Sequence, residues 1–82
     1  MDHAAYAKIE KQASQLAELS TQLGTEIGKL EVISLRINQH WSGPASTEFQ
    51  SQLKKTIETL KISQRNITHA RDDLNRAKDR YW

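Results

Sequence analysis

Trp41-Ser42-Gly43-Pro44, in the middle of the 82-residue chain, decides how the chain folds. Pro44 is the only proline. A proline disfavours the helical conformation in the residue before it, and it fits the first position of a new helix. Gly43 can turn the chain and cap that helix. The stretch therefore predicts a short turn between two segments, and a turn this short makes adjacent helices antiparallel.

Both segments carry apolar residues at the seven-residue spacing of packed helices. In the first segment the series is Ile9, Leu16, Leu23, Leu30 and Ile37, with Ala13, Leu19, Ile27, Ile33 and Trp41 at the alternate positions. In the second it is Leu53, Leu60, Ile67, Leu74 and Tyr81, with Phe49, Ile57, Ala70 and Ala77 between them. Neither segment has the period of two that a strand requires. We expect an all-α single domain over residues 1–82, an antiparallel two-helix hairpin with helices at about 5–39 and 45–80 and a turn at 40–44.

A two-helix hairpin buries only part of each apolar stripe, and small cores rarely supply more than about 3–5 kcal/mol. Val32, Leu35 and Ile62 fall outside the stripe, where an isolated hairpin exposes them. Gly24 and Gly28, four residues apart, can admit the close approach of another helix. We therefore expect the hairpin to assemble as a dimer into a four-helix bundle. The expected helix–helix interface is Leu16, Leu23, Ile27, Leu30, Ile37, Phe49, Leu53, Ile57, Leu60, Ile67 and Leu74.

Composition and charge argue against several classes of protein. The chain has no cysteine, which removes disulfides and thiolate metal sites. It has neither the ~18 apolar residues of a membrane span nor the features of a signal peptide at its N-terminus, so we expect a soluble chain made in the cytoplasm. Residues 1–49 carry four basic and six acidic side chains, and residues 50–82 carry eight and four. Opposite signs suit segments that lie against each other or a partner better than a phosphate backbone, so we expect no nucleic acid. The aliphatic, heptad-regular stripe suits another helix rather than lipid, so we expect no membrane insertion.

The sequence offers little for catalysis. His3, His40 and His69 are scattered, and no serine lies in the setting of an activated nucleophile. His69 can reach Asp72 and Asp73 on one helix face, but surface ion pairing explains that spacing. We expect no enzyme activity, no cofactor and no metal. Trp41 is the residue that stands out, either as a bulky cap packed across the turn or as a recognition residue at its tip.

The motif Trp41-Ser42-Gly43, placed between two heptad helices in a short chain, resembles the WXG100 (ESAT-6-like) family. Phe49, eight residues after Trp41, matches a position where that family usually has an aromatic residue. The resemblance covers essentially the whole chain: its length, hairpin layout, turn motif, lack of cysteine and lack of a signal peptide. Trp41 and Gly43 correspond to the turn motif of the family, whose tryptophan is associated with recognition by the export machinery.

The resemblance implies a small helical hairpin exported by the type VII secretion system, to the cell surface or the medium. Family members form homodimeric or heterodimeric four-helix bundles. Some are secreted factors in virulence or interbacterial competition, and others accompany a larger effector. The expected partners are a second copy, a related small helical protein or the helical N-terminal domain of an effector, together with the secretion machinery.

One departure from the family pattern favours an accessory role. Many members, or their partners, carry a Tyr-x-x-x-Asp/Glu signal after the second helix. Here Tyr81 is followed only by Trp82, and Tyr6 precedes Glu10 within the first helix. The signal is then supplied by a partner, lies on a lost tail or is replaced by another determinant. Two other hypotheses stay open: a non-secreted intracellular coiled-coil adaptor, and a small nucleic-acid binder with steeply salt-dependent affinity.

Overall fold

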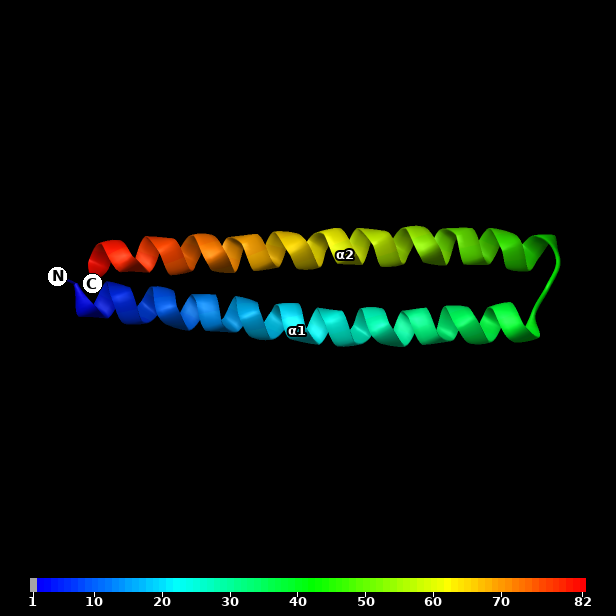
Figure 1. Cartoon of the computed structure of the whole chain (residues 1–82), viewed down its shortest axis with the longest axis horizontal. Helices are drawn as coiled ribbons and strands as arrows, with labels where there is room; N and C mark the ends of the chain where they lie inside the picture. The colour runs from blue at the N-terminus through cyan, green and yellow to red at the C-terminus, as the bar shows by residue number, and fades with distance from the viewer. Residues whose placement is uncertain (1) are drawn as a thin grey trace.

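A computed structural model describes residues 2–82 and shows two long helices lying side by side (Figure 1). α1 spans His3–His40, α2 spans Pro44–Lys78, and a short 3-10 turn, η1, follows at Asp79–Tyr81. The residues described form no strand. The expected all-α, antiparallel two-helix hairpin is confirmed, and it extends 63 Å along its longest axis. The four-helix bundle remains a prediction, because the structure contains one copy of the chain.

The helices begin and end within two residues of the expected positions. Asp2 caps α1, because its Oδ1 accepts a hydrogen bond from the backbone N–H of Ala5 at 2.9 Å. Such a cap stabilises a helix by about 1 kcal/mol, and it starts α1 before the expected residue 5. At the closed end, Pro44 takes the first position of α2. Gly43 has a φ of 108°, a backbone conformation that favours glycine.

The hydrophobic core is a narrow line where α1 and α2 touch. Ala13, Ile27 and Ile57 are the buried hydrophobic residues. The other expected interface residues are only half-buried, apart from Phe49, which is exposed. Two helices cannot enclose more than this line, because each helix has a neighbour on one side only.

The structure corrects the sequence analysis at two alternate positions of α1. Leu19 and Ile33, assigned to the apolar stripe, are 46% and 45% exposed. The inward positions belong instead to their neighbours Ser20 and Ser34, which are half-buried. Successive residues are rotated by about 100° around the axis of a helix. Leu19 and Ile33 therefore lie to one side of the contact line rather than on it.

The same correction applies to α2. Phe49 and Ala70, assigned to the stripe, are exposed, whereas Gln50 and Gln64 are half-buried and face α1. Tyr81, expected to end the stripe, lies beyond α2 in η1 and is 41% exposed.

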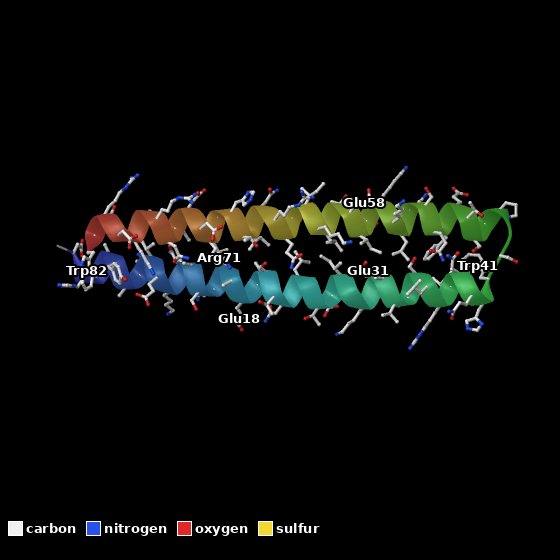
Figure 2. All side chains as sticks on the ribbon, viewed as in Figure 1. Glu18, Glu31, Trp41, Glu58, Arg71 and Trp82 are labelled. Carbon is white, nitrogen blue, oxygen red and sulfur yellow. The ribbon has the colours of Figure 1, made fainter. Side chains whose placement is uncertain are left out.

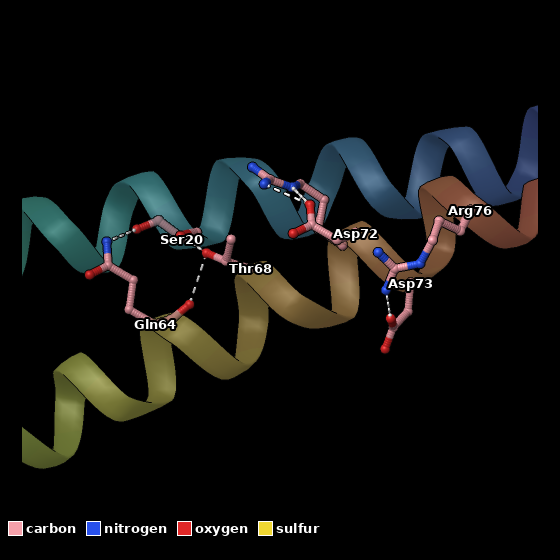
Figure 3. A network of polar contacts seen from close by, with 7 residues as sticks. Ser20, Gln64, Thr68, Asp72, Asp73 and Arg76 are labelled. Atoms are coloured by element: carbon pink, nitrogen blue, oxygen red, sulfur yellow. Dashed lines mark hydrogen bonds and ion pairs between the residues drawn. The ribbon is translucent and has the colours of Figure 1, made fainter.

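Two polar clamps, Ser34–Gln50 and Ser20–Gln64–Thr68, join the helices. The hydroxyl of Ser34 donates to Gln50 Oε1 at 2.8 Å, and Gln50 Nε2 donates to the Ser34 carbonyl oxygen at 3.1 Å. Gln64 Nε2 donates to the Ser20 carbonyl oxygen at 2.9 Å, and the hydroxyls of Ser20 and Thr68 lie 3.1 Å apart (Figure 3). The clamps are two heptads apart on both helices. They fix the register of α1 against α2, since a slip would break both.

The clamp at Gln64 predicts different effects of alanine at the two helical glycines. A Cβ at Gly24 would lie 2.7 Å from Gln64 Nε2, whereas a Cβ at Gly28 would meet nothing within 4 Å. In the single hairpin, at a protein concentration low enough to prevent association, Gly28→Ala should therefore gain up to about 1 kcal/mol of stability through helix propensity. The stability of Gly24→Ala should be about 1 kcal/mol lower than that of Gly28→Ala, because Gln64 must move and lose its hydrogen bond. Denaturant unfolding of both variants, repeated with Gln64→Ala, checks this; a difference that persists without Gln64 would contradict it.

Ile57 and Ile62 form a matched pair on α2. Ile57 is buried against α1, and Ile62 is 51% exposed. Ile57→Ala should destabilise the fold by about 2–5 kcal/mol, since it opens a cavity on the contact line. Ile62→Ala should change the free energy of unfolding by no more than about 0.5 kcal/mol. Thermal melts followed by circular dichroism measure both, and equal losses would contradict the assigned contact line.

Candidate functional site

The turn holds Trp41 in a fixed position at the closed end of the hairpin, opposite the end that carries Trp82 (Figure 2). The backbone N–H of Trp41 donates to the carbonyl oxygen of Ile37 at 2.8 Å, and the Trp41 carbonyl accepts from the hydroxyl of Ser46 at 3.0 Å. Ser46 is buried. The backbone N–H of Thr47 donates to the Gly43 carbonyl at 3.0 Å and closes the first turn of α2. The backbone N–H and the carbonyl oxygen of Trp41 are therefore both hydrogen-bonded within the chain.

The indole of Trp41 is partly packed and partly free. Its ring centroid lies 5.9 Å from that of Phe49, with the ring planes tilted by 48°. Each side chain is nevertheless nearly half exposed, at 46% for Trp41 and 47% for Phe49. The structural and the recognition interpretations of Trp41 are therefore compatible. One part of the ring supports the turn, and the rest is presented at the tip.

One side of the hairpin, which we call the aliphatic face, carries a row of accessible apolar residues. Its half-buried members are Leu16, Leu23, Leu30, Ile37, Leu53, Leu60, Ile67 and Leu74. Its exposed members are Leu19, Ile33 and Phe49. These three stand three or four residues from half-buried members, and residues at that spacing are neighbours on a helix surface.

The opposite side of the hairpin carries more charged and amide side chains. A shallow groove of about 480 Å³ lies there, and its lining includes Glu31 and Asn38 of α1 and Lys54 and Lys61 of α2. Lys61 Nζ lies 3.6 Å from Glu31 Oε2 across the helices, with both side chains about half exposed. Leu35 also lines the groove, so this side mixes charged, amide and aliphatic groups, whereas the aliphatic face has aliphatic and aromatic side chains along its length.

The aliphatic face is the part of the surface that most favours contact with another helix. Contiguous exposed apolar residues mark interaction sites more often than isolated ones do. Burying a side chain the size of Leu, Ile or Phe that is otherwise exposed contributes about 1.5–3 kcal/mol. The structure brings nine of the eleven expected interface residues to the edge of this face or onto it. The remaining two, Ile27 and Ile57, are buried between α1 and α2.

Sequence reasoning missed the polar clamp residues, because it looked for apolar side chains only. A signal was present. Ser20 and Ser34 recur two heptads apart, and so do Gln50 and Gln64. Each also completes the alternation of three and four residues that runs through the aliphatic positions. Polar residues at such positions are known to specify register.

Aromatic side chains pack together at the other end of the hairpin, where residues 2–6 lie beside residues 78–82. Trp82 lies 5.6 Å from Tyr6 and 6.4 Å from His3 between ring centroids. Lys78 Nζ sits 5.5 Å from the centroid of the Tyr6 ring. The backbone N–H of Asp2 donates to the carbonyl oxygen of Tyr81 at 3.1 Å. These contacts join η1 to the start of α1.

The acidic residues near His69 are engaged in ion pairs. Arg71 contacts Asp72 at 2.8 Å, and Arg76 contacts Asp73. Exposed pairs of this kind contribute about 0–1 kcal/mol. Within residues 2–82, His, Asp and Glu side chains form no group of three or more placed to hold a metal ion.

No helix in the described part of the chain has both the length and the apolar character needed to cross a membrane. The chain matches no protein-family model, and no match was found among curated proteins or solved structures. The resemblance to the WXG100 family therefore rests on the residues of this chain, and its function is a matter for proposal.

Proposed function

We propose that this chain is a small type VII secretion substrate or co-secreted partner that acts through helix–helix association. One observation carries the proposal: a hairpin with an uncovered aliphatic face presents a half-exposed Trp41, two residues before Gly43, at its tip. The aliphatic face supplies the means of association. The turn supplies the feature that the WXG100 family uses in export.

The aliphatic face is covered by a second copy of the chain, giving a four-helix bundle. Leu19, Ile33 and Phe49 are each nearly half exposed in the single hairpin, and a facing helix pair would enclose them. The half-buried leucines and isoleucines beside them would gain neighbours on their open side. A related small helical protein, or the helical N-terminal domain of a larger effector, offers the same kind of surface. In those cases this chain would chaperone or target the effector.

A non-secreted intracellular adaptor is the second candidate function. The contact between Trp41 and Phe49 favours it, because it gives the tryptophan a packing role that needs no export machinery. The location of the chain separates the two candidates. An adaptor stays in the cytosol of cells whose secretion system is active, whereas a substrate is recovered outside them.

The bundle predicts that polar substitutions on the aliphatic face break the assembly. The double variant Leu19→Gln with Ile33→Gln should halve the solution mass measured by light scattering, because it places amides in an apolar contact at a cost of about 1–3 kcal/mol each. Ile62→Gln is the control, since Ile62 is at least as exposed as Leu19 and Ile33 but does not belong to the aliphatic face. An unchanged mass in the double variant would exclude a second copy from this face. A heteromer would then be sought by adding candidate helical partners.

Export predicts a specific need for the Trp41 side chain. Trp41→Ala should abolish recovery of the chain outside the cell while the helix content measured by circular dichroism stays close to wild type. Phe49→Ala removes the same ring contact but leaves Trp41 at the tip, so it should still be exported. Wild-type export of Trp41→Ala would leave the tryptophan with a packing role only. Equal loss in both variants would mean that the ring contact, rather than recognition, is what export requires.

A further inference from the structure

The outer surface of α1 carries a second row of residues that neither the contact with α2 nor the aliphatic face uses. We call it the outer stripe. Its members, spaced alternately by four and three residues, are Thr21, Thr25, Gly28, Val32 and Leu35. Val32 is 47% exposed and Leu35 is 63% exposed. Val32 and Gly28 line a shallow hollow of about 550 Å³ together with Ile33 at the edge of the aliphatic face, whereas Leu35 borders the groove between the helices.

The outer stripe adds exposed aliphatic side chains to the middle of α1, on a side that also carries charged residues. Ile27 faces α2, Ile33 lies on the aliphatic face, and Val32 and Leu35 point elsewhere. Exposed aliphatic residues grouped on one side of a helix mark a contact more often than isolated ones do. The four-helix bundle proposed above covers Ile33 and leaves Val32 and Leu35 open. Covering them therefore requires a further contact.

Gly28 belongs to the same unexplained surface. A glycine in a helix costs about 1 kcal/mol relative to alanine. Gly24 has a role within the hairpin, because Gln64 occupies the space that a Cβ would need. No atom lies within 4 Å of the corresponding position at Gly28. Its lack of a side chain keeps the outer stripe flat, which lets another helix approach closely.

The order of residues in the outer stripe fits a parallel helix pair. Written as a heptad, Thr25 and Val32 occupy the a positions, and Gly28 and Leu35 occupy the d positions. β-Branched residues at a with leucine at d favour two parallel strands. A second copy of α1 supplies the same residues in the same register.

The flanking charges complement each other in that arrangement. Glu31 precedes Val32 at the g position, and Arg36 follows Leu35 at the e position. In a parallel pair the g residue of one helix faces the next e residue of the other. Glu31 of each copy therefore faces Arg36 of the other copy, which gives two pairs by symmetry. Glu31 is only loosely held by Lys61, at 3.6 Å and half exposed. An antiparallel pair centred on the stripe would instead bring Glu31 near Glu31 and Lys29 near Lys29.

We propose that the outer stripe is a contact between two copies of this chain, with their α1 helices parallel and Glu31 paired to Arg36 across it. The contact lies outside the proposed four-helix bundle, so both can exist in one assembly. It rests on the residues of α1 and does not depend on secretion.

Cysteine crosslinking can detect this contact specifically, because the chain has no cysteine and an introduced one reports only on its own position. Identical a positions are adjacent only in a parallel pair, so Val32→Cys should form an intermolecular disulfide with itself under mild oxidation. Ile62→Cys, which is similarly exposed on the outer side of α2, is the control. A rate for Val32→Cys no faster than for the control would overturn the proposal.

A charge exchange tests the pairing of Glu31 with Arg36. Two chains are made on the Val32→Cys background, one with Glu31→Arg and one with Arg36→Glu. Each alone places like charges across the stripe, whereas a mixture restores two opposite pairs. The mixed disulfide should therefore exceed either self-disulfide by about fivefold at low salt, with the excess falling as salt is added. A statistical mixture of products at low salt would contradict the parallel pairing.

Discussion

Two helices enclose only the line along which they touch, and the rest of this structure depends on that constraint. Ala13, Ile27 and Ile57 lie on the line and are buried, while the leucines and isoleucines beside it remain half open. A chain whose apolar residues spread this far around each helix cannot cover them by itself. Its remaining apolar surface is open to solvent in the single hairpin, and we propose that other helices cover it.

The side chains that set the fold of the hairpin differ from those proposed to bind another chain. The polar clamps, Ser34 with Gln50 and Ser20 with Gln64, fix the register of α1 and α2 through hydrogen bonds within one chain. Gly43 and the anchored Trp41 fix the turn. These contacts set the pairing of the helices within one chain, so under the proposed association a partner would not have to set it. Such preorganisation lowers the entropic cost of association.

The sequence predicted the fold well, because a proline next to a glycine and two heptad series are local signals. Helix ends were predicted within two residues, and the remaining shift at α1 came from the Asp2 cap. The apolar stripe was less accurate. Hydrophobicity favoured Leu19 and Ile33 over Ser20 and Ser34, although the helical phase sets which side chains face α2. The roles of Gly24 and Gly28 differ only through the position of Gln64, which no local pattern reveals.

The central claim is that this hairpin is an incomplete core that association completes. The most direct measurement is the helix melt of the purified chain over a wide range of concentrations, with the mass of each sample found by light scattering. We predict a multiple of 9.4 kDa and a melting temperature that rises with concentration, because association stabilises the folded state by mass action. A 9.4 kDa monomer that is fully helical and melts cooperatively at one temperature, whatever its concentration, would contradict the account.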